Sequence, residues 1–98
     1  MNFTIVIEPR ALADIQNGID YYDGLRIGLG EKFSLAVDKH IDYLYTNPFF
    51  QTSYDDYRAL PIEKFPFIIL FYIDEITNTV FVSAIFNTYQ DPEKYPQK

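Results

Sequence analysis

The chain lacks the residues on which most small metal-binding or disulfide-bonded proteins depend. Its 98 residues include no cysteine, no tryptophan and one histidine, His40. Without cysteine the chain can form neither a disulfide bond nor a thiolate metal site. One imidazole cannot supply the ligand cluster of a zinc site. We therefore expect no metal and no other cofactor, and a structural role for His40.

Glycine is also scarce, and its placement argues against a nucleotide site. Three of the four glycines lie between Gly24 and Gly30. No Gly-Lys-Ser/Thr sequence follows them and no strand precedes them, as a phosphate-binding loop would require. This stretch is predicted to link two helices.

Basic residues are few, and no apolar run is long. Eight Lys and Arg stand against fourteen Asp and Glu, which gives a net charge of −6. Nucleic-acid-binding proteins usually carry a basic face that neutralises phosphates, so the composition argues against a broad face of that kind. The run from Phe65 to Ile73 has nine residues, too few to span a bilayer as a helix. With no signal-peptide pattern in the first residues, we expect a cytoplasmic protein without a membrane partner.

The chain is rich in apolar and aromatic residues, at 48% and 18% respectively. Such a composition can bury a core, and the length suits one domain over residues 1–98. The run within Phe65–Asp74 predicts the central strand of a sheet, covered on both faces. Apolar residues at three- and four-residue spacing predict two helices before it. One helix has Leu12, Ile15, Ile19 and Tyr22 on its apolar face, and the other has Phe33, Val37, Ile41 and Leu44.

These patterns predict an α+β fold in the order strand, helix, helix, strand, strand, strand. The N-terminal strand precedes an antiparallel helical hairpin, which packs on one face of the sheet; a three-stranded antiparallel meander follows. The predicted ranges are 3–7, 9–23, 30–46, 57–63, 65–74 and 79–86. Residues 48–56 are predicted to form a loop. Its aromatic residues Phe49, Phe50 and Tyr54 either pack beneath the loop or form a binding patch.

Short motifs along the chain resemble those of the RelE/ParE toxin superfamily, the toxins of type II toxin–antitoxin, or plasmid stabilisation, modules. The resemblance rests on the order in which these motifs occur along the chain and on the matching order of helices and strands. The motifs are Ala13-Asp14-Ile15, Tyr21-Tyr22, Gly30-Glu31-Lys32-Phe33, Asn47-Pro48, Tyr57-Arg58-x-Leu60, Lys64-Phe65-Pro66-Phe67, Tyr72, Ala84-Ile85 and Asp91-Pro92.

The resemblance implies one of two activities, each with growth inhibition as its outcome. RelE-like toxins cleave mRNA on the ribosome with basic residues and a tyrosine, without a metal. ParE-like toxins bind and poison DNA gyrase and are not known as enzymes. Both are silenced by an antitoxin that wraps around the toxin, and both can oligomerise through it. The antitoxin is expected to lay a helix beside the helical hairpin and to add a strand at a sheet edge.

The residues that match the RelE pattern are incomplete. Ile68 stands where the central strand of RelE-like toxins carries an arginine, and residues 87–90 contain no cation. Cleavage by 2′-hydroxyl attack needs an acid, a base and cations that stabilise the phosphorane. The remaining nuclease candidates are Arg58, Lys64 and Tyr95. Their structural alternatives are an ion pair of Arg58 with Asp55 or Asp56, a solvated Lys64 and a packed Tyr95.

The pattern therefore favours a ParE-like binding protein over an enzyme. Phe65-Pro66-Phe67 and Asp91-Pro92 favour this subgroup, although Asn87, Tyr89 and Gln90 replace the histidine and basic residues often found there. The alternatives are a RelE-like endoribonuclease and a degenerate member without strong toxicity. Because antitoxins are commonly acidic, as this chain is, we expect apolar and aromatic antitoxin contacts. Candidates for target or antitoxin contact are Phe49, Phe50, Tyr54, Asn87, Tyr89 and Gln90.

Overall fold

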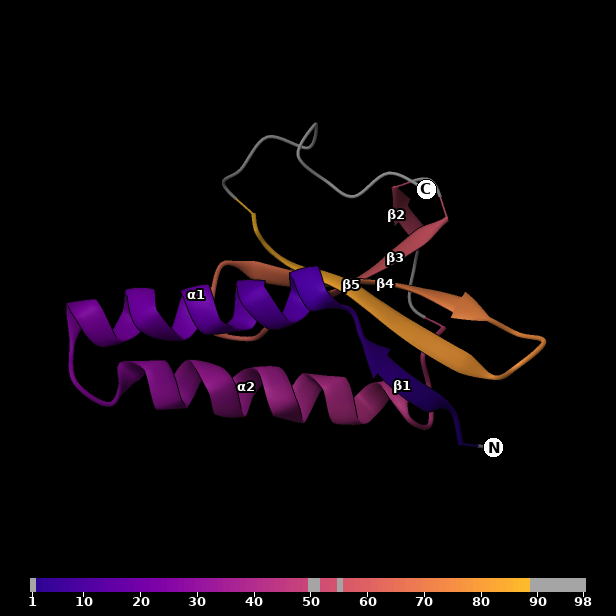
Figure 1. The fold of residues 1–98 in the computed structure, drawn as a ribbon, viewed down its shortest axis with the longest axis horizontal. Coiled ribbons are helices and arrows are strands. Elements are labelled where there is room, and N and C mark those ends of the chain that lie inside the picture. Colours follow the sequence, from indigo (N-terminus) through magenta and orange to yellow (C-terminus); the bar gives the residue numbers. More distant parts are fainter. Residues whose placement is uncertain (1, 50–51, 55, 89–98) are drawn as a thin grey trace.

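In the part of the chain that the structure describes, a strand and a helical hairpin precede four strands (Figure 1). The computed structural model describes residues 2–49, 52–54 and 56–88. In chain order the elements are β1 (Thr4–Ile7), α1 (Pro9–Leu25), α2 (Leu29–Leu44), β2 (Thr52–Tyr54), β3 (Tyr57–Pro61), β4 (Phe67–Asp74) and β5 (Thr79–Asn87). The predicted α+β order and helical hairpin are confirmed.

The strands form one sheet in the order β1-β5-β4-β3-β2. β4 lies at its centre, as its long apolar run predicts. The meander β3-β4-β5 is antiparallel, as predicted. β1 pairs with β5 in parallel, so the sheet as a whole is mixed.

Two details of the predicted strands are wrong. Residues 48–56 are not all loop, because β2 pairs with β3 at the sheet edge; a three-residue strand gives too little pattern to be detected. β3 and β4 are also shorter than predicted. Proline cannot donate to a strand ladder, and the chain turns between Pro61 and Pro66 with Lys64 at a φ of 72°.

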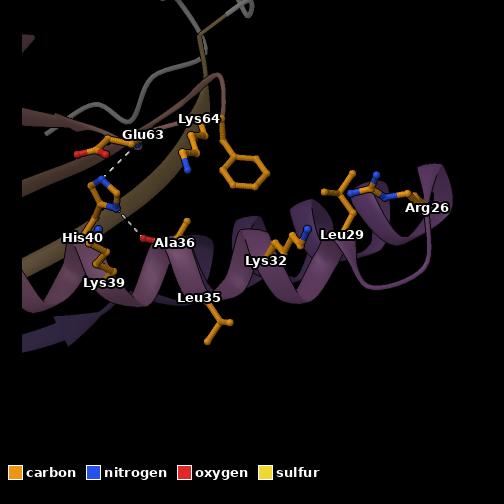
Figure 2. Close-up of a pocket in the computed structure, with 10 residues that line it drawn as sticks. Arg26, Leu29, Lys32, Leu35, Ala36, Lys39, His40, Glu63 and Lys64 are labelled. Atoms are coloured by element: carbon orange, nitrogen blue, oxygen red, sulfur yellow. Dashed lines mark hydrogen bonds between the residues drawn. The ribbon is translucent and has the colours of Figure 1, made fainter.

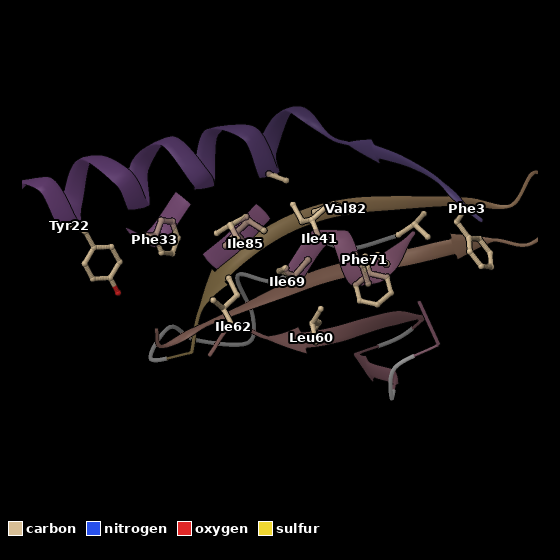
Figure 3. Packing of buried hydrophobic residues seen from close by; sticks show 14 residues of the cluster. Phe3, Tyr22, Phe33, Ile41, Leu60, Ile62, Ile69, Phe71, Val82 and Ile85 are labelled. Carbon is tan, nitrogen blue, oxygen red and sulfur yellow. The ribbon is translucent and has the colours of Figure 1, made fainter. Parts of the chain in front are cut away.

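Both helices pack on one face of the sheet and bury the main core against it (Figure 3). Phe33, Val37 and Leu44 of α2 are fully buried, as are Ile69 and Phe71 of β4. The opposite face of the sheet carries a second, smaller cluster of Leu70, Ala84 and Phe86. The apolar faces predicted for the helices and the central strand therefore correspond to buried faces, apart from the exposed Leu12 of α1.

Two glycines allow the helices to approach one another closely. A Cβ on Gly18 of α1 would collide with the Phe33 ring, and one on Gly30 of α2 would lie 2.5 Å from the Ile19 carbonyl oxygen. The Gly30 N–H donates to Asp23 Oδ1 at 2.9 Å. This carboxylate satisfies one of the free N–H groups at the start of α2, where Gly28 offers no side chain for capping.

In the part of the chain that the structure describes, neither helix is long and apolar enough to cross a bilayer.

Candidate functional site

A cavity of about 590 Å³ lies between α2 and the turn that joins β3 to β4 (Figure 2). We call it the α2 pocket. Its apolar lining comes from Leu29, Leu35 and Ala36 of α2 and from Phe65 of the turn. His40 and Glu63 join these two walls. The pocket is therefore a groove along one helix, with an apolar lining and a polar end.

Four cations surround the α2 pocket. Lys32 and Lys39 come from α2, Arg26 from the link between the helices, and Lys64 from the β3–β4 turn. Figure 2 shows Lys64 directed from the turn toward α2. Lys32 and Lys39 are seven residues apart, so they lie on one side of the helix at about 10 Å separation along its axis. The two lysines of α2 thus follow the groove rather than converge on one point.

These cations are not neutralised within the described part of the chain. An ion pair joins Arg10 to Asp14 at 3.7 Å, and neither residue lines the pocket. None of the four pocket cations has a carboxylate partner among residues 2–49, 52–54 and 56–88. Of the six Lys and Arg residues that the structure describes, four line the pocket, whereas Glu63 alone does so among the eleven described carboxylates. An acidic protein therefore carries a local positive region.

His40 connects the two walls of the pocket. Its Nδ1–H donates to the Ala36 carbonyl oxygen at 2.6 Å, and its Nε2 accepts from the Glu63 N–H at 3.2 Å. The imidazole is therefore the neutral Nδ1–H tautomer in this arrangement. The ring is 3% exposed, so it serves as a buried structural bridge, as the sequence predicts.

The turn that carries Lys64 is held by its own backbone. The Ile62 N–H donates to the Phe67 carbonyl at 2.9 Å, and the Phe65 N–H donates to the Ile62 carbonyl at 3.4 Å. Phe65 also packs edge-on against Tyr22 and Phe33 at 5.0 and 5.3 Å between ring centroids. The backbone bonds and the ring contacts together fix the position of Lys64 relative to α2.

A smaller cavity of about 210 Å³ lies between α1 and the end of β5. Asp14 and Asn87 are among the residues that line it. Asp14 Oδ2 accepts from the Ile85 N–H at 3.1 Å. Burial raises the pKa of Asp14 above its ordinary value, while the Ile85 N–H and the nearby Arg10 oppose that shift. This carboxylate ties α1 to β5.

The structure separates the candidate residues that it describes. Lys64 lines the α2 pocket and Asn87 lines the smaller cavity. Arg58 lines neither cavity, and its guanidinium lies 5.6 Å from the ring centroid of Phe49, which is 53% exposed. Phe50, Asp55, Tyr89, Gln90 and Tyr95 lie outside the described residues, and so does the side chain of Tyr54.

Sequence reasoning missed Arg26, Lys32 and Lys39. The seven-residue spacing of the two lysines was a signal, because it places both on one helix face. The proximity of Arg26 and Lys64 to that face depends on the hairpin and on the β3–β4 turn. No pattern local to either segment reveals it.

The site is suited to binding an anionic partner. Its groups are four cations, apolar side chains, His40 and Glu63, and neither Arg58 nor a hydroxyl-bearing side chain lines the α2 pocket. Across residues 2–49, 52–54 and 56–88 no group of three or more His, Asp or Glu side chains could hold a metal ion. The arrangement offers electrostatic attraction and a shallow apolar surface.

Comparison with known proteins identifies the fold. No family model matches the sequence, and no curated protein is similar to it in sequence. Among solved structures, the chain is similar to the chromosomal ParDE TA (toxin–antitoxin) system from P. aeruginosa, with a TM-score of 0.77 and 19% identity. The match covers 87% of this chain and 95% of the other.

The chain has the ParE/RelE-like toxin fold. The helical hairpin on one face of the sheet is part of this fold. The resemblance that the sequence motifs indicate is therefore confirmed at the level of the fold.

Proposed function

We propose that this protein is the toxin of a type II toxin–antitoxin module, that it acts as ParE-like toxins do by binding a macromolecular target such as DNA gyrase, and that a cognate antitoxin neutralises it. The observation that carries the proposal is the extent of the structural match, which covers 95% of a chain from a ParDE system at a TM-score of 0.77. A match over nearly the whole of both chains includes the hairpin, the sheet and their order.

The placement of side chains favours target binding over RNA cleavage. Ile68, at the position where RelE-like toxins carry an arginine, is half-buried and packs against the cluster of Leu70, Ala84 and Phe86. Lys64 lines the α2 pocket, whereas Arg58 lines neither this pocket nor the smaller cavity. Stabilising a phosphorane requires cations that point at one place, and neither of these two cavities holds both residues.

Inducible expression in a bacterial host tests the proposal. We expect growth arrest, rescue by co-expression of the short open reading frame beside the gene, and recovery of both proteins as one complex. The control is the same gene with an early stop codon. Unimpaired growth together with a folded product would contradict the proposal and would indicate a degenerate member.

The target is tested separately with purified components. Gyrase supercoiling and cleavage-complex assays are expected to show inhibition that the antitoxin reverses. Primer extension on cellular mRNA after induction is expected to show intact transcripts. Cleaved transcripts with unaffected gyrase would replace the ParE-like mechanism with the RelE-like one.

A further inference from the structure

The smaller cavity, between α1 and the end of β5, is lined by one carboxylate, two amides and two aromatic rings. Asp14, Asn17 and Tyr21 come from α1 at steps of three and four residues, so they lie on one face of the helix. Phe67 of β4 and Asn87 of β5 are paired neighbours in the sheet and form the other wall. The volume of about 210 Å³ suits a group of side-chain size rather than a large ligand.

Asp14 offers an unoccupied acceptor to this cavity. Both contacts that the described residues make with its carboxylate go to Oδ2, which accepts from the Ile85 N–H at 3.1 Å and lies 3.7 Å from Arg10 Nε. In the described part of the chain, no buried side-chain oxygen or nitrogen lacks a hydrogen-bond partner. Oδ1 is therefore accessible rather than enclosed. Because Asp14 lines the cavity, Oδ1 can accept from a donor placed there.

The negative charge of Asp14 is only partly neutralised within the chain. Arg10 does not line the cavity, and its side chain is 43% exposed, so water screens its ion pair with Asp14. The contact with Ile85 does not need the charge, because an amide oxygen would accept the same bond. Burial raises the pKa of Asp14, which means that water stabilises its carboxylate poorly. A bound cation would supply that stabilisation.

The two rings favour a flat cation over a compact one. Tyr21 and Phe67 both pack against Tyr22, at 5.1 and 6.2 Å between ring centroids, and these contacts hold them beside the cavity. Aromatic faces attract cations, and a guanidinium stacks on them more readily than an ammonium, which is more strongly hydrated. The carboxylate and the two amide oxygens of the cavity also match the several N–H donors of a guanidinium.

We propose that this cavity binds a guanidinium group, with Asp14 Oδ1 as the anionic acceptor and the rings of Tyr21 and Phe67 beside the planar cation. The proposal goes beyond the proposed function and does not depend on it. The net charge of −6 assists binding, since it attracts cations from solution. A metal ion fits less well, because one carboxylate lines the cavity and the described residues contain no group of three metal-ligating side chains.

Two probes of nearly the same shape test the need for positive charge. Butylguanidinium is a cation, whereas butylurea is neutral. In titrations at pH 7 followed by amide chemical shifts, butylguanidinium is expected to bind with a Kd of about 1–10 mM. Butylurea is expected to bind about tenfold more weakly or less. The shifts should concentrate in residues 14–21, 67 and 85–87. Equal binding of the two probes, or shifts centred elsewhere, would overturn the proposal.

A matched pair of variants separates Asp14 from the overall charge. Asp14→Asn removes the charge and keeps an acceptor for the Ile85 N–H. Asp38→Asn makes the same change at an exposed residue of α2 that does not line the cavity. We expect Asp14→Asn to weaken butylguanidinium binding by about tenfold or more and to abolish the preference over butylurea, and Asp38→Asn to weaken binding by less than about twofold.

Circular dichroism checks that both variants are folded. Unchanged affinity in the Asp14→Asn variant, or equal losses in the two variants, would contradict the assignment of Asp14 as the acceptor.

Two further ligands distinguish the sources of the guanidinium group. Agmatine represents a free small molecule, and the peptide acetyl-Gly-Arg-Gly-amide represents an arginine side chain of a protein. Peptide binding about fivefold tighter than that of agmatine would identify a site for an arginine side chain, and the reverse order would identify a free ligand. If neither ligand shifts the cavity amides, the proposal is wrong. None of these results bears on toxicity, which the growth assay tests on its own.

Discussion

His40 shows how one side chain can position a whole binding surface. It is the single histidine of the chain, and its two ring nitrogens bond to Ala36 of α2 and to Glu63 of the β3–β4 turn. The sequence predicts a structural role from the lack of a nearby nucleophile. Which backbone groups it joins could not be predicted, because Glu63 is 23 residues away in the chain.

Replacing this ring should loosen the turn. We expect His40→Ala to lower the free energy of unfolding by about 2 kcal/mol, because it removes a buried ring and the acceptor of the Glu63 N–H. Urea denaturation measures the loss, and amide exchange at Glu63 should become faster. Lys39→Ala, an exposed neighbour on α2, is the control and should change stability by less than about 0.5 kcal/mol. Equal stability of both variants would show that the bridge contributes nothing.

Asp14 should make stability depend on pH in an unusual direction for a carboxylate. Burial raises its pKa in the folded protein above the ordinary value of 3.8. The folded state therefore binds the proton more tightly than the unfolded state. The stabilisation that comes from protonated Asp14 is complete below pH 3.8, and it is lost as the pH rises through the raised pKa of the folded protein.

Asp14→Asn tests this contribution. The amide oxygen can still accept from the Ile85 N–H, and the group no longer ionises. We expect the variant to be more stable than the wild type at pH 7 and the difference to shrink as the pH falls toward 3.8. Urea denaturation of both proteins between pH 3.5 and 7 gives the comparison. A difference that grows toward low pH would reverse the assigned sign.

At the scale of elements, the close approach of α1 and α2 depends on where the glycines lie. Gly30 of α2 lies against the Ile19 carbonyl of α1, whereas Gly24 has no neighbouring atom within 4 Å of an added Cβ. Both lie within helices, where alanine is intrinsically favoured by about 1 kcal/mol. The two positions should therefore respond to the same substitution with opposite signs.

We expect Gly30→Ala to lower the free energy of unfolding by about 1–3 kcal/mol, since a backbone oxygen must move to admit the methyl group. Gly24→Ala should raise it by about 0.5–1 kcal/mol. Thermal and urea denaturation of the two variants provide the measurement. Stabilisation by both substitutions would mean that the helices can separate without cost.

The elements themselves were largely predictable because their patterns are local. Residues such as Phe33, Val37, Ile41 and Leu44 repeat with the helical period, and all four are buried. The exceptions depend on partners distant in the chain. β2 forms only by pairing with β3, and the turn at Lys64 shortens two strands. The parallel pairing of β1 with β5 joins opposite ends of the sequence, and no local pattern encodes it.

At the scale of the whole molecule, the overall composition did not indicate the positively charged pocket. A net charge of −6 is an average, and it gives no sign that Arg26, Lys32, Lys39 and Lys64 surround one cavity. Of the two nuclease candidates whose positions the structure describes, Lys64 lines this pocket and Arg58 does not. This difference between Lys64 and Arg58 depends on the fold, which brings the β3–β4 turn over α2.

The fold as a whole should not survive the loss of its first strand. β1 pairs along one side of β5 from Thr79 to Val82, and Phe3 belongs to the core that it helps to close. We expect deletion of residues 2–7 to abolish the cooperative unfolding transition, since the loss approaches the total stability of about 5–15 kcal/mol typical of such proteins.

Far-ultraviolet circular dichroism during heating measures this effect. The control is Val6→Ser, because Val6 is 40% exposed and its loss should shift the transition by only a few degrees. A deletion variant that still melts cooperatively near the wild-type temperature would show that the first strand is dispensable.

The partnership of Thr4 with Thr79 also constrains when the protein can fold during its synthesis. β1 must wait for β5, which is made much later, before their ladder can form, and contacts of such long sequence separation slow folding. Until then the nascent chain exposes the apolar faces of both helices, which favours aggregation. Synthesis must therefore have passed β5 before the native sheet can form, and a product that is terminated before Thr79 should be inert and degraded.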